Sequence, residues 1–309
     1  MIKKILFYLS FVVLSVIAIA LIILLINEPG FLYGEIILSF THYIAPGSLI
    51  ISIILLIVLK RKFFYLHISL FLIILIFTFV HTIPLPAYEK LKKHNIISVI
   101  HYNVYLYNRN KNSIVKIIKK ENPHVVTLHE MNWSFHSFVA KKLKKQYPFW
   151  SGRTGRFQGM MIYSKFPIVQ YKIKWIGYNR IIIARIKKGD KIFSLVTCHP
   201  YAPISKRHFL FRNKQIKRIA NAVKKIRGPL IVTGDFNAVP WSSVMRDFKE
   251  KTKLTDSRKS FMNTFPSKGF VKVPIDYIFT SKEIIPLRSK RLYSPFSDHF
   301  GIYSELQYK

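Results

Sequence analysis

The chain has 309 residues and a formal net charge of +35, with 49 Lys and Arg against 14 Asp and Glu. Half of the residues are hydrophobic, which excludes a disordered chain, and 12 Gly with 15 Pro exclude collagen-like and low-complexity sequence. The single cysteine excludes an intramolecular disulfide and a structural zinc site built from several thiolates.

The N-terminal part holds three long runs without a charged residue, at 5–27, 36–59 and 63–83. About 20 such residues cross a bilayer as a helix, because every backbone polar group is then hydrogen bonded within the segment. We therefore expect residues 1–88 to form a membrane anchor with three transmembrane helices. A cleaved signal peptide is the alternative for the first run, although that run is longer than a usual signal core.

Basic residues beside these runs predict how the anchor is oriented. Lys3 and Lys4 precede the first run and residues 60–62 are all basic, which favours a cytoplasmic N-terminus. Three crossings then place the rest of the chain outside the cytoplasm. The lysines of the linker at 89–95 argue for the opposite orientation, but long domains are translocated largely regardless of charge. We expect an integral membrane protein with an extracytoplasmic catalytic domain.

The remaining residues, 96–309, alternate between strand and helix patterns. The mixture of hairpins and crossovers predicts an α/β fold, a four-layer sandwich in which two packed mixed sheets are flanked by helices. Strands are predicted at 96–104, 124–128, 159–163, 168–175, 180–186, 192–197, 230–233, 275–279, 284–292 and 302–306, and helices at 113–120, 134–145, 205–226 and 242–248.

Polar residues follow the ends of several predicted strands, where a rigid scaffold can bring them together. Each one alone is also typical of a turn, a helix cap or a solvated residue, but that explanation must then hold separately for every cluster. Other histidines, such as His124 and His136, are expected on the surface. The strand-end set consists of Asn103, Glu130, His199, Asp235, Asn237, Asp276, Asp298 and His299.

These residue types suit the metal-assisted hydrolysis of a phosphate ester. Mg²⁺ prefers oxygen ligands and keeps several waters, so one or two carboxylates suffice, and Glu130 is the first candidate. Asp235 is a candidate to orient or deprotonate the attacking water, while Asn103 and Asn237 can hydrogen bond phosphate oxygens without repelling them. The two histidines can donate protons and stabilise transition-state charge, with Asp276 fixing one tautomer.

In this order, Gly-Asp-Phe-Asn, Ile-Asp-Tyr-Ile and the C-terminal Ser-Asp-His resemble motifs of the endonuclease/exonuclease/phosphatase superfamily, over about residues 97 to 307. The apolar N-terminus is similar to that of a membrane-anchored bacterial branch with N-terminal transmembrane helices. The resemblance implies a Mg²⁺-dependent phosphoesterase, with Mn²⁺ as a substitute. It assigns catalysis to His199, Asp235, Asn237, Asp276 and His299, and metal binding to Glu130, Asp298 and Asn103.

Arg153 and Arg156 lie on a glycine-containing loop before a strand. There they are candidates to bind phosphate alongside Asn103 and Asn237, and simple solvation at the surface is the alternative.

The function that we expect is a membrane-tethered, nuclease-like phosphoesterase that hydrolyses phosphodiester or phosphomonoester bonds by metal-assisted in-line attack of water. Its partners are the phosphoester substrate, either nucleic acid or an anionic lipid headgroup, and the bilayer through residues 5–83, with no obligate protein partner. One alternative is a phosphodiesterase for phospholipid or sphingomyelin-type headgroups. Another is a non-catalytic, membrane-bound module that binds polyanions.

Overall fold

The computed structural model describes residues 95–155, 158–177 and 179–309, together with isolated positions among the first 76 residues. The three predicted transmembrane segments therefore lie almost wholly outside the described residues and remain a prediction. Among the described residues, no helix is long and apolar enough to cross a membrane. Nearly all of the described residues belong to one compact unit, formed by 84–239 and 247–309.

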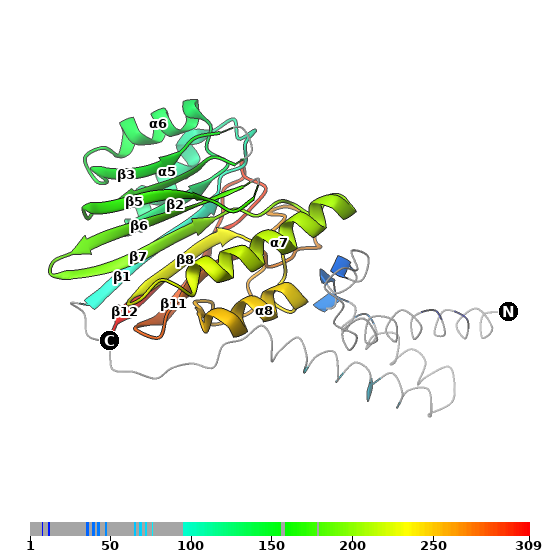
Figure 1. Ribbon diagram of the computed structural model, residues 1–309. Helices are drawn as coiled ribbons and strands as arrows, with labels where there is room; N and C mark the ends of the chain where they lie inside the picture. The colour runs from blue at the N-terminus through cyan, green and yellow to red at the C-terminus, as the bar shows by residue number, and fades with distance from the viewer. Residues whose placement is uncertain are drawn as a thin grey trace. The chain divides into compact units, whose positions relative to one another are not determined.

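The described strands form two mixed sheets of six strands each (Figure 1). The first consists of β1 (Ile96–Asn103), β2 (Val125–His129), β3 (Phe149–Arg153), β4 (Met160–Ser164), β11 (Ile284–Leu292) and β12 (Gly301–Tyr308), in the order β11-β12-β1-β2-β4-β3. The second consists of β5 (Ile168–Trp175), β6 (Arg180–Lys188), β7 (Lys191–Cys198), β8 (Leu230–Asp235), β9 (Thr255–Asp256) and β10 (Asp276–Thr280), in the order β5-β6-β7-β8-β10-β9.

The two sheets pack face to face through a core of aliphatic side chains that includes Ile97, Val125, Ile182, Leu195 and Ile231, all fully buried. Alternation along each strand sends every second side chain into this core and the others outward. This burial supplies the main driving force for the packing of the two sheets.

Helices cover the outer faces of both sheets (Figure 1). On the first sheet, α5 (Lys111–Glu121) and α6 (Trp133–Leu143) share a second buried cluster with residues of β1, β2 and β4. On the second sheet lie α7 (Lys206–Val223) and α8 (Ser243–Thr252), and the Phe248 ring of α8 packs against Phe279 of β10. The predicted pair of packed mixed sheets with flanking helices is thus confirmed.

Polar side chains fix where the helices begin. The side chain of Asn110 accepts a hydrogen bond from the Ser113 amide at the start of α5, and Asn132 does the same for the Phe135 amide at the start of α6. Each cap satisfies a backbone donor that has no partner within the helix.

The strand register brings the predicted site residues to one edge of the molecule. In the first sheet Asn103 pairs with His129 across the parallel strands β1 and β2. In the second sheet Asp235, the last residue of β8, lies opposite Asp276, the first residue of the antiparallel strand β10. The functional ends of both sheets therefore meet at the same end of the sandwich.

The expectation that His136 lies on the surface is wrong, and His124 is only partly exposed. His136 is buried, and its Nδ1 atom lies 2.8 Å from the Tyr163 hydroxyl. His124 is half-buried, and its Nδ1 atom accepts a hydrogen bond of 2.9 Å from the Ser98 amide. Both imidazoles help to pack the outer parts of the first sheet.

Candidate active site

Asp235, at the end of a strand of the second sheet, contacts polar side chains from both sheets. Its Oδ1 atom accepts a hydrogen bond of 2.9 Å from the Asn237 amide. Its Oδ2 atom accepts one of 3.2 Å from Asn103 Nδ2, and lies 3.5 Å from His199 Nε2 and 3.6 Å from His299 Nε2. A buried carboxylate thus has two imidazole nitrogens directed at one of its oxygens.

Asn103 links Asp235 to the second carboxylate of the site. Its Nδ2 group also donates a hydrogen bond of 3.0 Å to Glu130 Oε1, and the Leu106 amide donates one of 2.8 Å to Glu130 Oε2. The neutral Asn103 amide therefore lies between two acidic side chains and reduces their repulsion.

Asp276 holds His299 in place. Its Oδ2 atom lies 2.9 Å from His299 Nδ1, which leaves His299 Nε2 facing Asp235. Its Oδ1 atom lies 3.1 Å from His101 Nε2, and its backbone amide donates a hydrogen bond of 3.1 Å to Thr264 Oγ1. His101 and this role of Thr264 were not predicted from the sequence. The signal for His101 was its position two residues before Asn103, on the same face of β1.

Charges at the centre change the protonation of both histidines. Burial alone lowers the pKa of His299, but the charges of Asp276 and Asp235 outweigh burial and raise that pKa to about 10. Burial likewise opposes the charged form of His199, but its hydrogen bond to Asp235 and the charge of that aspartate raise the pKa of His199 above its ordinary value. Both imidazoles are therefore set up to carry a proton.

The same interactions keep Asp276 ionised. Burial raises the pKa of its carboxyl, but the charge of His299 and the hydrogen bond from His101 bring it well below its ordinary value. A carboxylate held in this way fixes the tautomer and the orientation of its histidine partners.

Asp298 lies beside this centre, and one of its carboxylate oxygens lacks a hydrogen-bond partner among the described residues. This oxygen, Oδ1, is buried. Burial raises the pKa of the Asp298 carboxyl to about 6, His299 opposes this rise, and the charge of Glu130 adds to it. Two carboxylates that repel each other, one of them with an unpaired buried oxygen, fit a site for a divalent cation.

Asp235, Asp276 and His299 also offer ligand atoms that lie within 4.8 Å of one another. Both Asp276 oxygens, however, already face imidazole nitrogens, at 2.9 and 3.1 Å. This trio could hold a metal or handle protons, and Glu130 and Asp298, with Asn103 nearby, form a second candidate set of metal ligands.

Two of the functional residues adopt backbone conformations that L-residues rarely take. Glu130 has φ of 59° and Asn237 has φ of 51°. Asn tolerates the left-handed region, whereas Glu does so only at an energetic cost, and such outliers are concentrated at functional sites. The turn at Glu130 is stabilised by Met131, whose amide donates to the Gly159 carbonyl at 3.1 Å and whose carbonyl accepts from the Gly155 amide at 3.0 Å.

Two side chains of helix α7 form hydrogen bonds with the loops that carry Asn237 and His199. The buried Arg212 donates a hydrogen bond of 2.7 Å to the Asn237 carbonyl, and Gln215 accepts one of 2.9 Å from the Tyr201 amide. These two side chains fix the loops that follow β8 and β7, and so they position Asn237 and His199 without reaching the centre themselves.

Among the described residues, Arg153 makes no hydrogen bond or ion pair with this cluster. Arg153 ends β3 in register with Met160, and its side chain is exposed at the same end of the sheet as His129. Arg156 lies outside the described residues. A phosphate-binding role for either arginine remains a prediction.

The sequence matches the Endonuclease/Exonuclease/phosphatase family over residues 100–299, a span that contains all eight strand-end residues. The chain belongs to this family. Members of the endonuclease/exonuclease/phosphatase family are metal-dependent phosphoester hydrolases, and the prediction of an enzyme of this class is confirmed. A comparison with curated proteins finds no match.

Solved structures share the fold of the family at low sequence identity. An endonuclease/exonuclease/phosphatase from Beutenbergia cavernae DSM 12333 is 17% identical with a TM-score of 0.58, covering 69% of this chain and 72% of its own. D. rerio TDP2 complexed with single-strand DNA product is 17% identical with a TM-score of 0.60, covering 69% and 99%. The human Nocturnin catalytic domain with bound sulfate anion is 19% identical with a TM-score of 0.58, covering 70% and 94%.

Proposed function

We propose that this chain is a membrane-tethered, Mg²⁺-dependent phosphodiesterase that cleaves nucleic acid by in-line attack of water. The observation that carries the proposal is the arrangement around Asp235, whose Oδ2 atom has His199 Nε2 at 3.5 Å and His299 Nε2 at 3.6 Å. A carboxylate flanked by two proton-carrying imidazoles suits the removal of a proton from water and the delivery of one to a leaving oxygen.

Each side chain has a separate role in this reaction. Asp235, held by the Asn237 amide, orients the water and accepts its proton. His299, held by Asp276, directs Nε2 toward the charge that develops on the phosphate, and His199 does so from the other sheet. The side-chain amide of Asn237 is oriented by a hydrogen bond of 3.1 Å to the Pro200 carbonyl.

Glu130 and Asp298 are the residues that would hold Mg²⁺. When bound there, this ion would neutralise charge on the phosphate and would lower the pKa of a water molecule. The unpartnered Asp298 oxygen supports this assignment, and oxygen ligands of this kind favour Mg²⁺ or Mn²⁺ over softer metals.

The purified full chain tests the proposal on a phosphodiester strand in the presence of Mg²⁺. We expect turnover that stops on addition of a chelator and returns with excess Mg²⁺. We also expect the double variant Asp235→Asn/His299→Gln to lose on the order of a hundredfold or more in kcat, because both changes remove groups that act on the transition state. Full activity of that variant would refute the assignment.

The membrane tether is a separate part of the proposal and rests on the three uncharged runs at 5–27, 36–59 and 63–83. The full chain is expected to remain with the membrane fraction after an alkaline carbonate wash. A protease added to the outside of intact cells is expected to digest the catalytic domain. Release by carbonate would contradict the anchor, and protection from protease would contradict the extracytoplasmic placement.

A further inference from the structure

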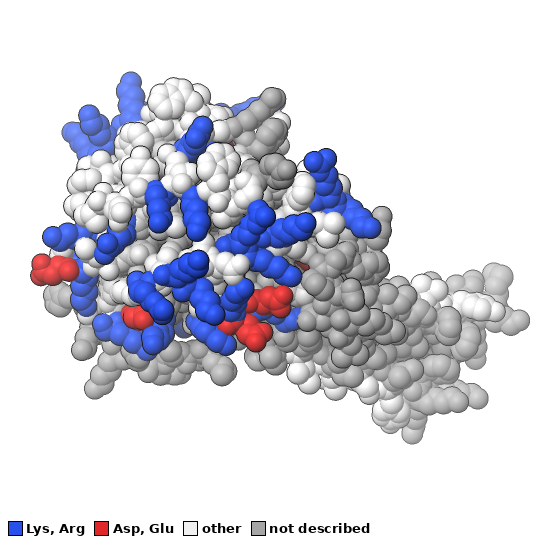
Figure 2. Space-filling view, viewed as in Figure 1, with Lys and Arg blue, Asp and Glu red and all other residues white. Residues whose placement is uncertain are grey.

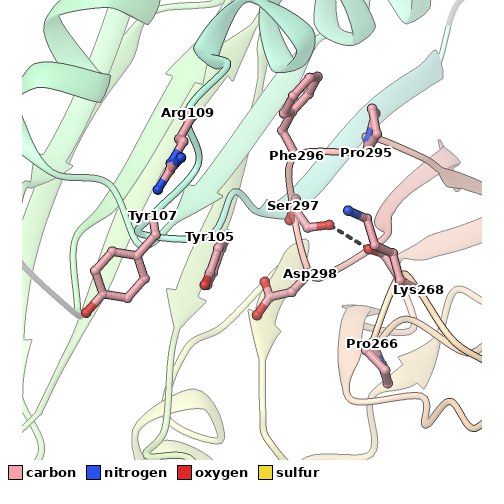
Figure 3. A pocket seen from close by; sticks show the side chains of 10 residues that line it. Tyr105, Tyr107, Arg109, Pro266, Lys268, Pro295, Phe296, Ser297 and Asp298 are labelled. Carbon is pink, nitrogen blue, oxygen red and sulfur yellow. Dashed lines mark hydrogen bonds between the residues drawn. The ribbon is translucent and has the colours of Figure 1, made fainter.

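A pocket of about 410 Å³ opens beside Asp298 (Figure 3). Tyr105, Tyr107 and Arg109 line it from the loop after β1, and Lys268 and Phe296 line it from the opposite side. Because Asp298 belongs both to the pocket and to the candidate metal site, a group bound in the pocket is adjacent to the phosphate under attack.

The loop that carries Tyr105 and Tyr107 is hydrogen bonded to Asn103 and Glu130 of the candidate active site. The Tyr105 amide donates a hydrogen bond of 3.1 Å to Asn103 Oδ1, and the next amide, that of Leu106, donates to Glu130 at 2.8 Å. Asn108 closes the turn with a hydrogen bond of 2.8 Å from its side chain to the Val104 carbonyl. The loop therefore cannot move without disturbing the two residues to which it is bound.

The backbone of Tyr105 adopts a conformation that is unfavourable for a tyrosine, so the surrounding structure holds the loop in this position. The Tyr105 φ of 67° lies in the left-handed region, which a bulky residue adopts only when the surrounding structure imposes it. Its ring meets the Tyr107 ring at a centroid distance of 5.5 Å and an interplanar angle of 69°. Tyr107 is nevertheless 60% exposed and Phe296 42% exposed, so both present ring surface to the solvent.

Both cationic and anionic ligands can bind aromatic rings, and the charged residues of the pocket favour an anionic ligand. A quaternary ammonium headgroup binds aromatic rings through cation–π attraction, but here Arg109 and Lys268 would repel it and outnumber Asp298, the one acidic residue of the lining. Neither of these two side chains has an ion pair among the described residues of the chain, so both are available to an anion. Exposed rings together with two cations suit a planar ring joined to phosphates.

We propose that this pocket binds one unstacked nucleobase against Tyr107 and Phe296, with Arg109 and Lys268 on the flanking phosphates. The inference rests on the proposed phosphodiesterase function and specifies its substrate as single-stranded nucleic acid. In a duplex, the bases are already paired and stacked, and the pocket cannot reach them without the cost of unstacking.

The test compares two strands of equal length and charge with the full chain and Mg²⁺. One is oligothymidylate, and the other is a base-free strand of tetrahydrofuran phosphates. The stacking of one base contributes enough to give a kcat/KM ratio of roughly tenfold to a hundredfold in favour of oligothymidylate. Tyr107→Ala is expected to bring this ratio close to one, mainly by raising KM on oligothymidylate, while Tyr107→Phe keeps the ratio.

Tyr171→Ala serves as the matched control, since Tyr171 is a similarly exposed tyrosine on β5, outside the pocket. It is expected to keep the wild-type ratio. Equal turnover of both strands by the wild type, or a ratio that Tyr107→Ala leaves unchanged, would overturn the base pocket while leaving the phosphodiesterase intact. Absence of metal-dependent cleavage on both strands would refute the proposed function as well. Faster turnover of sphingomyelin vesicles than of oligothymidylate would also contradict the pocket assignment.

Discussion

Asp276 is a buried residue that holds two histidines of the candidate site in place. It has no exposed surface, and its two oxygens face His101 on β1 and His299 in the loop before β12. Burial raises the pKa of the Asp276 carboxyl, but the charge of His299 and the hydrogen bond from His101 bring it well below its ordinary value. The orientation and the charge of His299 therefore both depend on this carboxylate.

Replacing Asp276 by Asn tests this dependence. The amide keeps the size of the side chain but loses the charge, so His299 is expected to lose its proton and its tautomer, and kcat is expected to fall by about a hundredfold or more. Steady-state kinetics give kcat, and thermal unfolding reports stability. The matched control is Asp256→Asn, at a buried aspartate paired with Arg258 outside the site, which is expected to lower Tm without this loss of kcat. Equal effects of both changes on kcat would contradict the role of Asp276.

His124 predicts a pH dependence of stability. Burial, together with the charges of Lys188 and Lys165, lowers the pKa of His124 to about 4, and its Nδ1 atom accepts the Ser98 amide hydrogen only when it is unprotonated. The unfolded chain binds this proton near pH 6.5 and the folded chain only near pH 4. The free energy of unfolding therefore falls as the pH falls from about 6.5 to about 4 and is unaffected by this group above that window.

The His124 contribution is about 1 to 2 kcal/mol after allowance for its partial exposure. His124→Asn removes the titration and keeps an acceptor for the Ser98 amide. Urea unfolding at pH 7 and at pH 5 is expected to show a smaller loss of stability for the variant than for the wild type. Parallel losses in the two proteins would contradict the assignment.

At the scale of the element, the position of Glu130, a candidate metal ligand, depends on how closely neighbouring backbones approach. A Cβ atom at Gly159 would lie 1.9 Å from the Met131 carbonyl oxygen, which follows Glu130 directly. At Gly155, in the same loop, the nearest neighbour of a Cβ atom is the end of the Arg180 side chain at 3.2 Å. The first position has no room for a methyl group, whereas the second has a neighbour that can move.

Gly159→Ala and Gly155→Ala form a matched pair. Gly159→Ala is expected to destabilise the fold by about 1 to 3 kcal/mol and to lower activity strongly, because Met131 must shift and Glu130 moves with it. Gly155→Ala is expected to change both quantities little. Thermal unfolding and strand cleavage under saturating Mg²⁺ measure the two effects, and similar results for the pair would contradict the steric explanation.

The sequence predicted most of these elements because their apolar patterns are strong. The limits of β5 and β11 agree with the predicted 168–175 and 284–292. It missed β3, where only Ser151 is buried and no alternation is visible, and β9, which has two residues. Strands this short or this exposed are defined by pairing with their neighbours, which a single-sequence pattern does not contain.

The convergence of the site was predictable because its residues follow strand ends, and strand ends of one sheet share an edge. What was not predictable is the set of contacts across the molecule. His101 reaches Asp276 over a separation of 175 residues, and Asn103 reaches Asp235 over 132. The tyrosine loop after β1 was also missed, because its position depends on hydrogen bonds to Asn103 and Glu130 that no local pattern reveals.

At the scale of the whole molecule, the chain carries a strongly positive surface. Figure 2 shows Lys and Arg spread over the face with α7 and α8, with few Asp and Glu among them. Lys172, Lys174, Arg185, Lys225 and Arg227 line a hollow on this side that has no acidic lining residue. Such a surface attracts polyanions and accelerates their encounter with the enzyme.

The positive surface predicts a steep effect of salt. On a nucleic-acid strand, log kcat/KM is expected to fall linearly with log salt concentration, because binding releases counterions from the phosphates. On a small phosphodiester that carries one phosphate and no other charge, the slope of log kcat/KM against log salt concentration is expected to be much smaller. Cleavage rates between low and physiological salt measure both slopes. Equal slopes would show that the surface charge does not serve substrate binding.

The most direct test of the central claim is a Mg²⁺ titration of strand cleavage by wild type, Glu130→Gln and Glu250→Gln, an exposed glutamate on α8. Loss of a ligand carboxylate is expected to raise the Mg²⁺ concentration for half-maximal activity by about tenfold or more in Glu130→Gln, whereas Glu250→Gln follows the wild type. An unchanged Mg²⁺ requirement in Glu130→Gln, or full wild-type activity in the presence of a chelator, would contradict the claim that these side chains hold a metal for phosphodiester hydrolysis.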